Sequence, residues 1–162
     1  MKPELRFIKN KSDLGLAFIS GVFLPDVYQA VPETAPTPGA LAFGGIALPR
    51  AQRKMGTFTA IDVNTGARRW QKSVPTPVIG GALATAGGLV FYGEGASTNG
   101  ALVALDAATG AELLRLPTAA GVNAAPMTFV AQGHQLITVA AGGNALALSK
   151  LGNLIITLEV AP

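Results

Sequence analysis

The 162-residue chain contains no cysteine, which excludes a disulfide framework and a cysteine-based zinc site. Charged residues make up only 13% of the chain, and the net charge is +3. The basic cluster of Arg50, Arg53 and Lys54 is not interleaved with aromatic residues, so we expect a solvated loop and no nucleic-acid partner. The apolar run at residues 14–24 is too short to span a bilayer. What is present is glycine, with 20 residues, and short apolar runs typical of β-strands.

A phrase that occurs twice is the strongest pattern in the chain. Residues 59–66 and 103–110 both contain an apolar strand that runs into Asp-x-x-Thr-Gly, a turn in which Asp accepts from its own backbone and Gly supplies a positive φ. Asp62 and Asp106 are 44 positions apart, which is the spacing of one four-stranded propeller blade. The repeat therefore predicts an all-β fold, a partial β-propeller.

Trp70 and Leu114 follow the two turns at matching positions. We expect both side chains to point the same way from their blades and to fill the space between neighbouring blades, where a Trp would bury roughly 150–250 Å². The two turn aspartates are predicted to be structural and to lie on different blades.

The strand pattern divides the chain into a divergent segment with a Pro-rich connector, residues 1–55, and a partial propeller, residues 56–162. We expect one complete blade at about residues 80–116, between two incomplete ones. Propellers close with about four to eight blades, so the chain is predicted to be part of a longer protein or to associate with further blades or further copies of itself. The expected strands are residues 57–63, 68–73, 80–85, 89–93, 101–106, 111–116, 124–130, 135–141 and 153–160.

The first 55 residues allow three interpretations. Four basic residues precede the apolar run at 14–24, which loosely imitates a secretory signal, although Glu4 and Asp13 do not fit one. A strand or strand pair of the fold is the favoured interpretation of the run, and an artefactual or divergent start is the third. Residues 31–39, which contain three prolines, are expected to form an irregular connector.

Several glycine-rich and apolar strings follow residue 56, at residues 80–93, 104–106, 109–110, 125–129 and 139–143. Together they resemble the C-terminal blades of the PQQ-dependent quinoprotein dehydrogenases. The resemblance covers roughly two thirds of the chain, and the ending at residues 150–156 is most similar to the membrane-bound glucose and polyol dehydrogenase branch. It implies that the repeated phrase is the tryptophan-docking motif. The copy around Trp70 matches it except at Ala67, where Lys is usual, and the second copy has Leu114 in place of Trp.

The resemblance implies oxidation of an alcohol or sugar hydroxyl by hydride transfer to the quinone, with a carboxylate base and a Ca²⁺ ion as Lewis acid. In the family, the base and the metal ligands lie in preceding blades, so no catalytic or metal-binding residue is predicted in this chain. The family also implies a periplasmic location and ubiquinone or a cytochrome as electron acceptor.

What the resemblance places here is one edge of the PQQ pocket, which we name the cofactor lip. Its predicted cofactor-binding residues are Ile79, Gly80, Gly81, Gly143 and Asn144. Asn144 stands where the family has Trp or His, and its amide can donate and accept hydrogen bonds but cannot carry a proton near neutral pH.

Two other candidates have simpler explanations. The string Gly93-Glu94-Gly95 lacks the third glycine of a dinucleotide fingerprint, so we expect a loop between strands. His134, the only histidine, is predicted to lie at a polar turn.

A non-catalytic scaffold built from the same repeats is the alternative function. The missing base and metal ligands favour the scaffold, whereas the glycine strings of the cofactor lip favour a dehydrogenase.

Overall fold

The computed structural model describes residues 15–23, 28–31, 46–49, 55–76, 78–145 and 149–159. Two predicted regions lie outside these ranges: the basic cluster at residues 50–54, and the connector at residues 31–39 except for its first residue, Val31. Within them every regular element is a strand, and no helix is long and apolar enough to cross a membrane.

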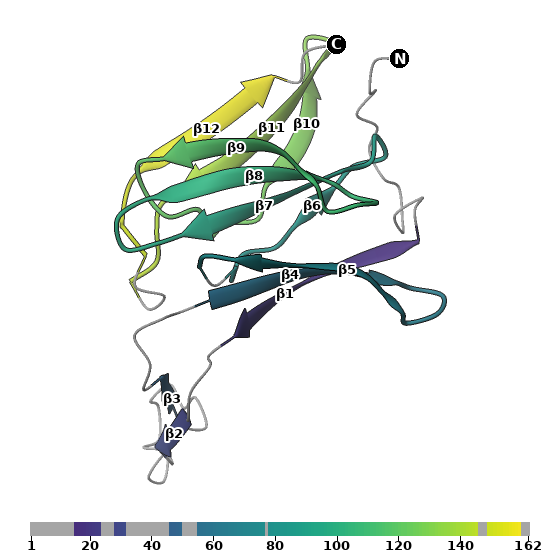
Figure 1. The fold of residues 1–162 in the computed structure, drawn as a ribbon. Coiled ribbons are helices and arrows are strands. Elements are labelled where there is room, and N and C mark those ends of the chain that lie inside the picture. The colour runs from purple at the N-terminus through teal and green to yellow at the C-terminus, as the bar shows by residue number, and fades with distance from the viewer. Residues whose placement is uncertain are drawn as a thin grey trace, which may run out of the picture.

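The strands form three antiparallel sheets that stack one on another, with a separate hairpin (Figure 1). The chain is therefore all-β, with the sheets arranged as consecutive blades of a partial propeller. Sheet one contains β1 (Leu16–Phe23), β4 (Met55–Asp62) and β5 (Arg68–Val74). Sheet two contains β6 (Leu83–Ala84), β7 (Leu89–Gly95), β8 (Gly100–Asp106) and β9 (Glu112–Thr118). Sheet three contains β10 (Met127–Ala131), β11 (His134–Ala141) and β12 (Leu154–Glu159), and the hairpin pairs β2 (Tyr28–Val31) with β3 (Ile46–Pro49).

Strand β1 occupies the apolar run for which a signal, a strand and a divergent start were all possible. It pairs with β4, from Leu16 opposite Asp62 to Phe23 opposite Met55. Sheet one thus includes residues from before the predicted boundary at residue 55, and the division into two regions stays a prediction.

The start of β1 repeats the start of β7. Gly15 has a φ of +62° and its carbonyl accepts from the amide of Val63, while Gly88 has a φ of +79° and its carbonyl accepts from the amide of Ala107, both at 2.8 Å. Both glycines precede a Leu-x-Phe sequence. Strand β1 is therefore the counterpart of β7. This repeat is hard to recognise in the sequence because the β2–β3 hairpin separates β1 from β4.

Most predicted strands lie within a few residues of the observed ones, but the expected loop at Gly93-Glu94-Gly95 is wrong. These three residues end strand β7 and are buried. The strand expected at residues 80–85 is reduced to β6, because Gly80 and Gly81 lie in the connection that follows β5. His134 begins β11 after a tight turn in which Gln132 and Gly133 have positive φ, and its Nδ1 atom lies within hydrogen-bond distance of the Glu159 carboxylate.

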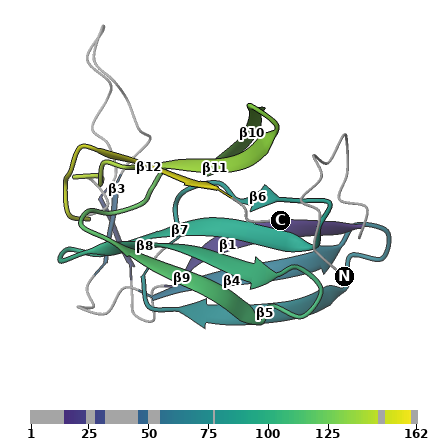
Figure 2. The ribbon, with the colours of Figure 1, turned by 90° about the horizontal axis from the view of Figure 1, so that it is seen from above.

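Sheet two forms the centre of the fold, since both of its faces are covered (Figure 2). Successive side chains of a strand point to opposite faces. Accordingly, Val90 and Tyr92 pack in a cluster with sheet one that includes Phe58, while Phe91 packs in a second cluster with Ile137 of sheet three. The Phe58 and Tyr92 rings stack with centroids 4.6 Å apart.

The two repeated turns have the same geometry. The Oδ1 atom of Asp62 accepts from two amides of its turn at 3.0 and 3.1 Å, and that of Asp106 accepts from two amides at 3.1 and 2.8 Å. The backbone hydrogen bonds lower the pKa of the Asp62 carboxyl, and the Thr109 hydroxyl followed by the turn amides lowers the pKa of the Asp106 carboxyl. The prediction of structural turn aspartates in different sheets is confirmed.

Candidate functional site

The first half of the cofactor lip lies between β5 and β6. The side chain of Ile79 is 45% exposed, so an apolar surface faces outward here. Gly80 lies against the chain at Asn123, where a Cβ atom would stand 2.8 Å from the Asn123 carbonyl oxygen. A Cβ atom at Gly81 would stand 3.0 Å from the Cβ of Ala125. Glycine at residue 80 therefore permits a close approach of two backbone segments.

The second half of the lip lies in the connection between β11 and β12. Gly143 has a φ of +70°, and a Cβ atom there would collide with the carbonyl of Lys150. The amide of Asn144 donates to the Ser149 hydroxyl at 2.7 Å, and the amide of Ser149 donates to the Asn144 carbonyl at 3.0 Å. The positive φ and the nearby Lys150 carbonyl together require glycine at residue 143.

Residues 121–123, which follow β9, join the two halves. The Gly121 carbonyl accepts from the amide of Gly143 at 2.8 Å, and the Asn123 side-chain amide donates to the Ser149 hydroxyl at 2.6 Å. Because the Asn123 carbonyl also lies against Gly80, one short segment contacts both glycine strings. The sequence analysis missed this segment, whose only local signal is the Gly121 and Asn123 pair between two predicted strands.

The chemistry of these residues can be compared with what a planar cofactor would need at one edge. The exposed Ile79 side chain offers an apolar surface that a flat ring system can contact, and Gly80 and Gly81 let this segment lie close against residues 123–125. The described part of the chain has no group of three or more His, Cys, Asp or Glu side chains that could hold a metal ion. The lip is thus compatible with contact to the ring, while the remainder of a cofactor site would need residues from elsewhere.

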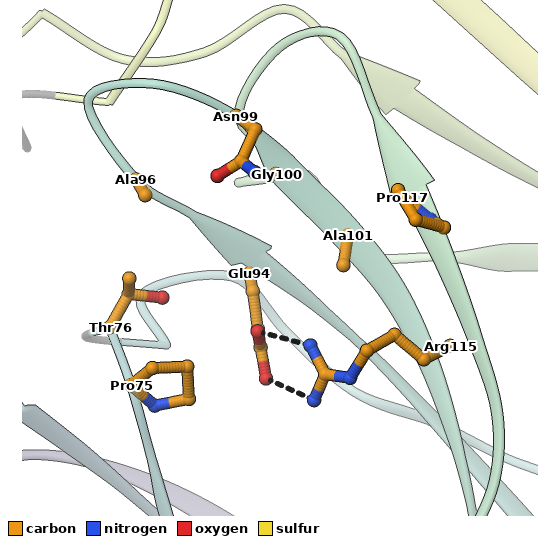
Figure 3. Close-up of a pocket in the computed structure, with 9 residues that line it drawn as sticks. All are labelled: Pro75, Thr76, Glu94, Ala96, Asn99, Gly100, Ala101, Arg115 and Pro117. Carbon is orange, nitrogen blue, oxygen red and sulfur yellow. Dashed lines mark hydrogen bonds and ion pairs between the residues drawn. The ribbon is translucent and has the colours of Figure 1, made fainter.

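A cavity of about 280 Å³ opens at the end of β5, between sheets one and two (Figure 3). Its wall includes Glu94 and Arg115, whose side chains form a double hydrogen bond. The hydroxyl of Thr76 points into the cavity and is buried without a hydrogen-bond partner among the described residues. The lining residues are Pro75, Thr76, Glu94, Ala96, Asn99, Gly100, Ala101, Arg115 and Pro117.

A charge network runs through this wall and connects the two sheets. Arg115 donates to Glu112 and to Glu94, and both carboxylates raise the pKa of the guanidinium. Lys72 of β5 donates to Glu112 at 3.1 Å, and Arg115 followed by Lys72 lowers the pKa of Glu112 to about 2. Burial, then the charge of Glu94, raises the pKa of Tyr92. With two carboxylates and two cations, the network is neutral overall.

Comparison with known proteins identifies the family. The sequence model described as "PQQ: Glucose/ethanol/alcohol dehydrogenase, beta-propeller domain" matches residues 40–137, a range that begins before the predicted boundary at residue 55. The chain is 40% identical over 94 residues to the quinohemoprotein alcohol dehydrogenase of Comamonas testosteroni, a match that covers 58% of this chain and 13% of that protein. It is 31% identical over 163 residues to the quinohemoprotein alcohol dehydrogenase ADH-IIG of Pseudomonas putida, covering 93% of this chain and 22% of that one.

The fold comparison agrees with the sequence comparison. The solved structure of ADHIIG from Pseudomonas putida HK5 superposes with a TM-score of 0.65 at 29% identity, covering 97% of this chain and 27% of that chain. The chain therefore spans about a quarter or less of the relatives it matches. By sequence and by fold, it belongs to the PQQ family of glucose/ethanol/alcohol dehydrogenase β-propeller domains.

Proposed function

We propose that this chain supplies consecutive blades and one edge of the cofactor site of a PQQ-dependent dehydrogenase that oxidises an alcohol or sugar hydroxyl. The observation that carries the proposal is the convergence of Gly80 and Gly143 on residues 121–123. A scaffold would need the docking turns and could use the close packing that the glycines permit, but it would need no approach to a quinone, which the exposed Ile79 side chain beside these glycines would supply.

The residues of the lip have distinct roles in this proposal. The Ile79 side chain covers part of the cofactor face and excludes water from it, while Gly80 and Gly81 hold the Ile79 backbone by packing against residues 123–125. The Gly143 turn fixes the position of Asn144 through Ser149. PQQ, when bound, supplies the acceptor for the hydride of the oxidised alcohol.

Other parts of the enzyme are also proposals. The carboxylate base and the Ca²⁺ ligands would come from further blades, as would the strands that close the propeller. The membrane-bound glucose and polyol branch remains a prediction from residues 150–156, since the relatives described above are alcohol dehydrogenases. We further propose a periplasmic location and electron transfer to ubiquinone or a cytochrome, on the family resemblance alone.

Complementation tests the proposal. The Comamonas testosteroni enzyme is expressed without the segment that matches this chain, together with the full 162-residue chain, and is supplied with PQQ and Ca²⁺. We expect alcohol-dependent dye reduction only when both parts are present. If PQQ binds neither to the chain alone nor to the chain together with the truncated enzyme, and the chain forms a stable oligomer of itself, the dehydrogenase proposal fails and the scaffold is favoured.

A matched pair of substitutions connects that activity to the lip. Ile79 and Val63 are 45% and 46% exposed, and they lie beyond opposite ends of β5. A carboxylate at the lip would repel the anionic carboxyl groups of PQQ, so Ile79→Asp is expected to weaken PQQ binding by about tenfold or more. Val63→Asp introduces the same charge far from the lip and should leave binding unchanged. Equal effects of the two substitutions would contradict the assignment.

A further inference from the structure

The string Gly93-Glu94-Gly95 has two functions in strand β7, one on each face. Because alternate residues of a strand point to opposite faces, the two glycines face sheet three and the Glu94 side chain faces sheet one. Glu94 is 4% exposed, which is unusual for a carboxylate and requires that its charge be compensated.

Both oxygens of the Glu94 carboxylate have partners. The Arg115 guanidinium donates to Oε2 at 2.8 Å and to Oε1 at 3.2 Å (Figure 3). The Tyr92 hydroxyl donates to Oε1 at 3.0 Å. A fork of two parallel hydrogen bonds fixes the position and the direction of the carboxylate, and so of the strand end that carries it.

The opposite face of the same strand end contacts residues 121–123. The Glu94 carbonyl accepts from the amide of Val122 at 3.0 Å. A Cβ atom at Gly93 would collide with Val122, and one at Gly95 would stand 2.7 Å from the side-chain oxygen of Asn123. Glycine on both sides of Glu94 is therefore what allows the two backbones to lie in direct contact.

We propose that Glu94 and Arg115 are a positioning pair for the cofactor lip. The pair fixes the end of β7, and this strand end fixes residues 121–123. Those residues in turn contact Gly80 and Gly143. This inference rests on the proposed function of the lip. The connection runs through two backbone hydrogen bonds, Val122 to Glu94 and Gly143 to Gly121. The neighbouring carbonyl of Ala96 adds a third, from the amide of Lys150 at 2.7 Å.

Amide hydrogen exchange of the full chain tests the connection without any cofactor. Arg115→Gln should speed exchange at the amides of Val122 and Gly143 by about tenfold or more, because the buried Glu94 loses its fork and the strand end opens more often. Arg69→Gln is the matched control, since Arg69 forms a 2.8 Å ion pair with Asp62 at the far end of sheet one. It should leave both amides unchanged.

Substitutions at Glu94 show whether the two residues act together. Glu94→Gln keeps the size and one acceptor, so its effect on the Val122 and Gly143 amides should be smaller than that of Glu94→Ala. The double variant Glu94→Gln/Arg115→Gln should show no more exchange than Arg115→Gln alone, since each residue acts through the other. Additive effects would overturn the pairing.

The cofactor provides the second measurement. In the complemented enzyme, Arg115→Gln should weaken PQQ binding and shift the absorbance of the bound quinone, with Arg69→Gln unchanged in both. Unaltered exchange at Val122 and Gly143 in the Arg115 variant would overturn the inference. Failure of the unsubstituted chain to bind PQQ would instead refute the proposed function, and the exchange result would still decide whether the pair positions residues 121–123.

Discussion

The indole ring of Trp70 lies over Gly110, which belongs to the repeated turn of the next sheet. Its Nε1–H donates to the carbonyl of Ala107 in that turn at 3.0 Å, and a Cβ atom at Gly110 would stand 2.8 Å from Cδ2 of the ring. The ring also packs beside Phe18 and Phe58, with centroids 5.9 and 6.0 Å away. One Trp and one turn glycine thus join sheet one to sheet two.

The two turn glycines permit a direct measurement of this joint. Gly66 and Gly110 have φ values of +71° and +74°, but nothing lies within 4 Å of a Cβ atom at Gly66. Gly66→Ala should destabilise the chain by about 1 kcal/mol, the cost of a left-handed alanine. Gly110→Ala should cost about 1–3 kcal/mol more, because the methyl group would displace the indole ring. Urea unfolding measures both, and equal losses would contradict the docking contact.

Trp70 and Leu114 should differ in their contribution to stability. Trp70→Ala should lower the free energy of unfolding by about 2–3 kcal/mol, somewhat less than for a fully buried Trp. Leu114 occupies the matching position but is 43% exposed, so Leu114→Ala should cost less than about 1 kcal/mol. Circular dichroism is the appropriate signal, since Trp70 is the only tryptophan of the chain.

Acid should weaken the contact between sheets one and two through Glu112. Its folded pKa of about 2 lies below the ordinary value of 4.5, so its pairing with Arg115 and Lys72 stabilises the fold above pH 4.5. That contribution is lost as the pH falls from 4.5 towards 2. Solvent screens the pair, which limits the effect to about 1 kcal/mol. In unfolding experiments from about pH 6 to about pH 2.5, a range that includes most of this window, the variant Glu112→Gln should lose this part of the pH dependence. A dependence identical to that of the unsubstituted chain would exclude Glu112 as its source.

Local sequence predicts those parts of the fold that depend on turns and alternation. The spacing of Asp62 and Asp106 correctly places two hairpins, and the matching Trp70 is packed between sheets as expected. Both hairpins also shift register at the same point, after Ala60 and after Ala104. No residue type at these positions predicts the shift.

The errors occur where the partner is distant in the sequence. Gly93-Glu94-Gly95 has the composition of a loop, and only the close approach of residues 121–123 explains why a strand needs glycine there. Strand β1 was ambiguous because its partner β4 begins more than thirty residues later, at Met55. In the cofactor lip the sequence indicates glycine strings but not the segment that joins them. The cofactor role of Ile79, Gly80, Gly81, Gly143 and Asn144 stays a prediction.

Equilibrium dialysis of PQQ against the complemented enzyme is the most direct test of the central claim. The unsubstituted chain, combined with the remaining propeller from the Comamonas testosteroni enzyme and Ca²⁺, should retain one quinone for each assembled propeller. Ile79→Asp should weaken that retention by about tenfold or more. Retention of PQQ that is the same with and without this chain would contradict the claim that the chain forms one edge of the cofactor site.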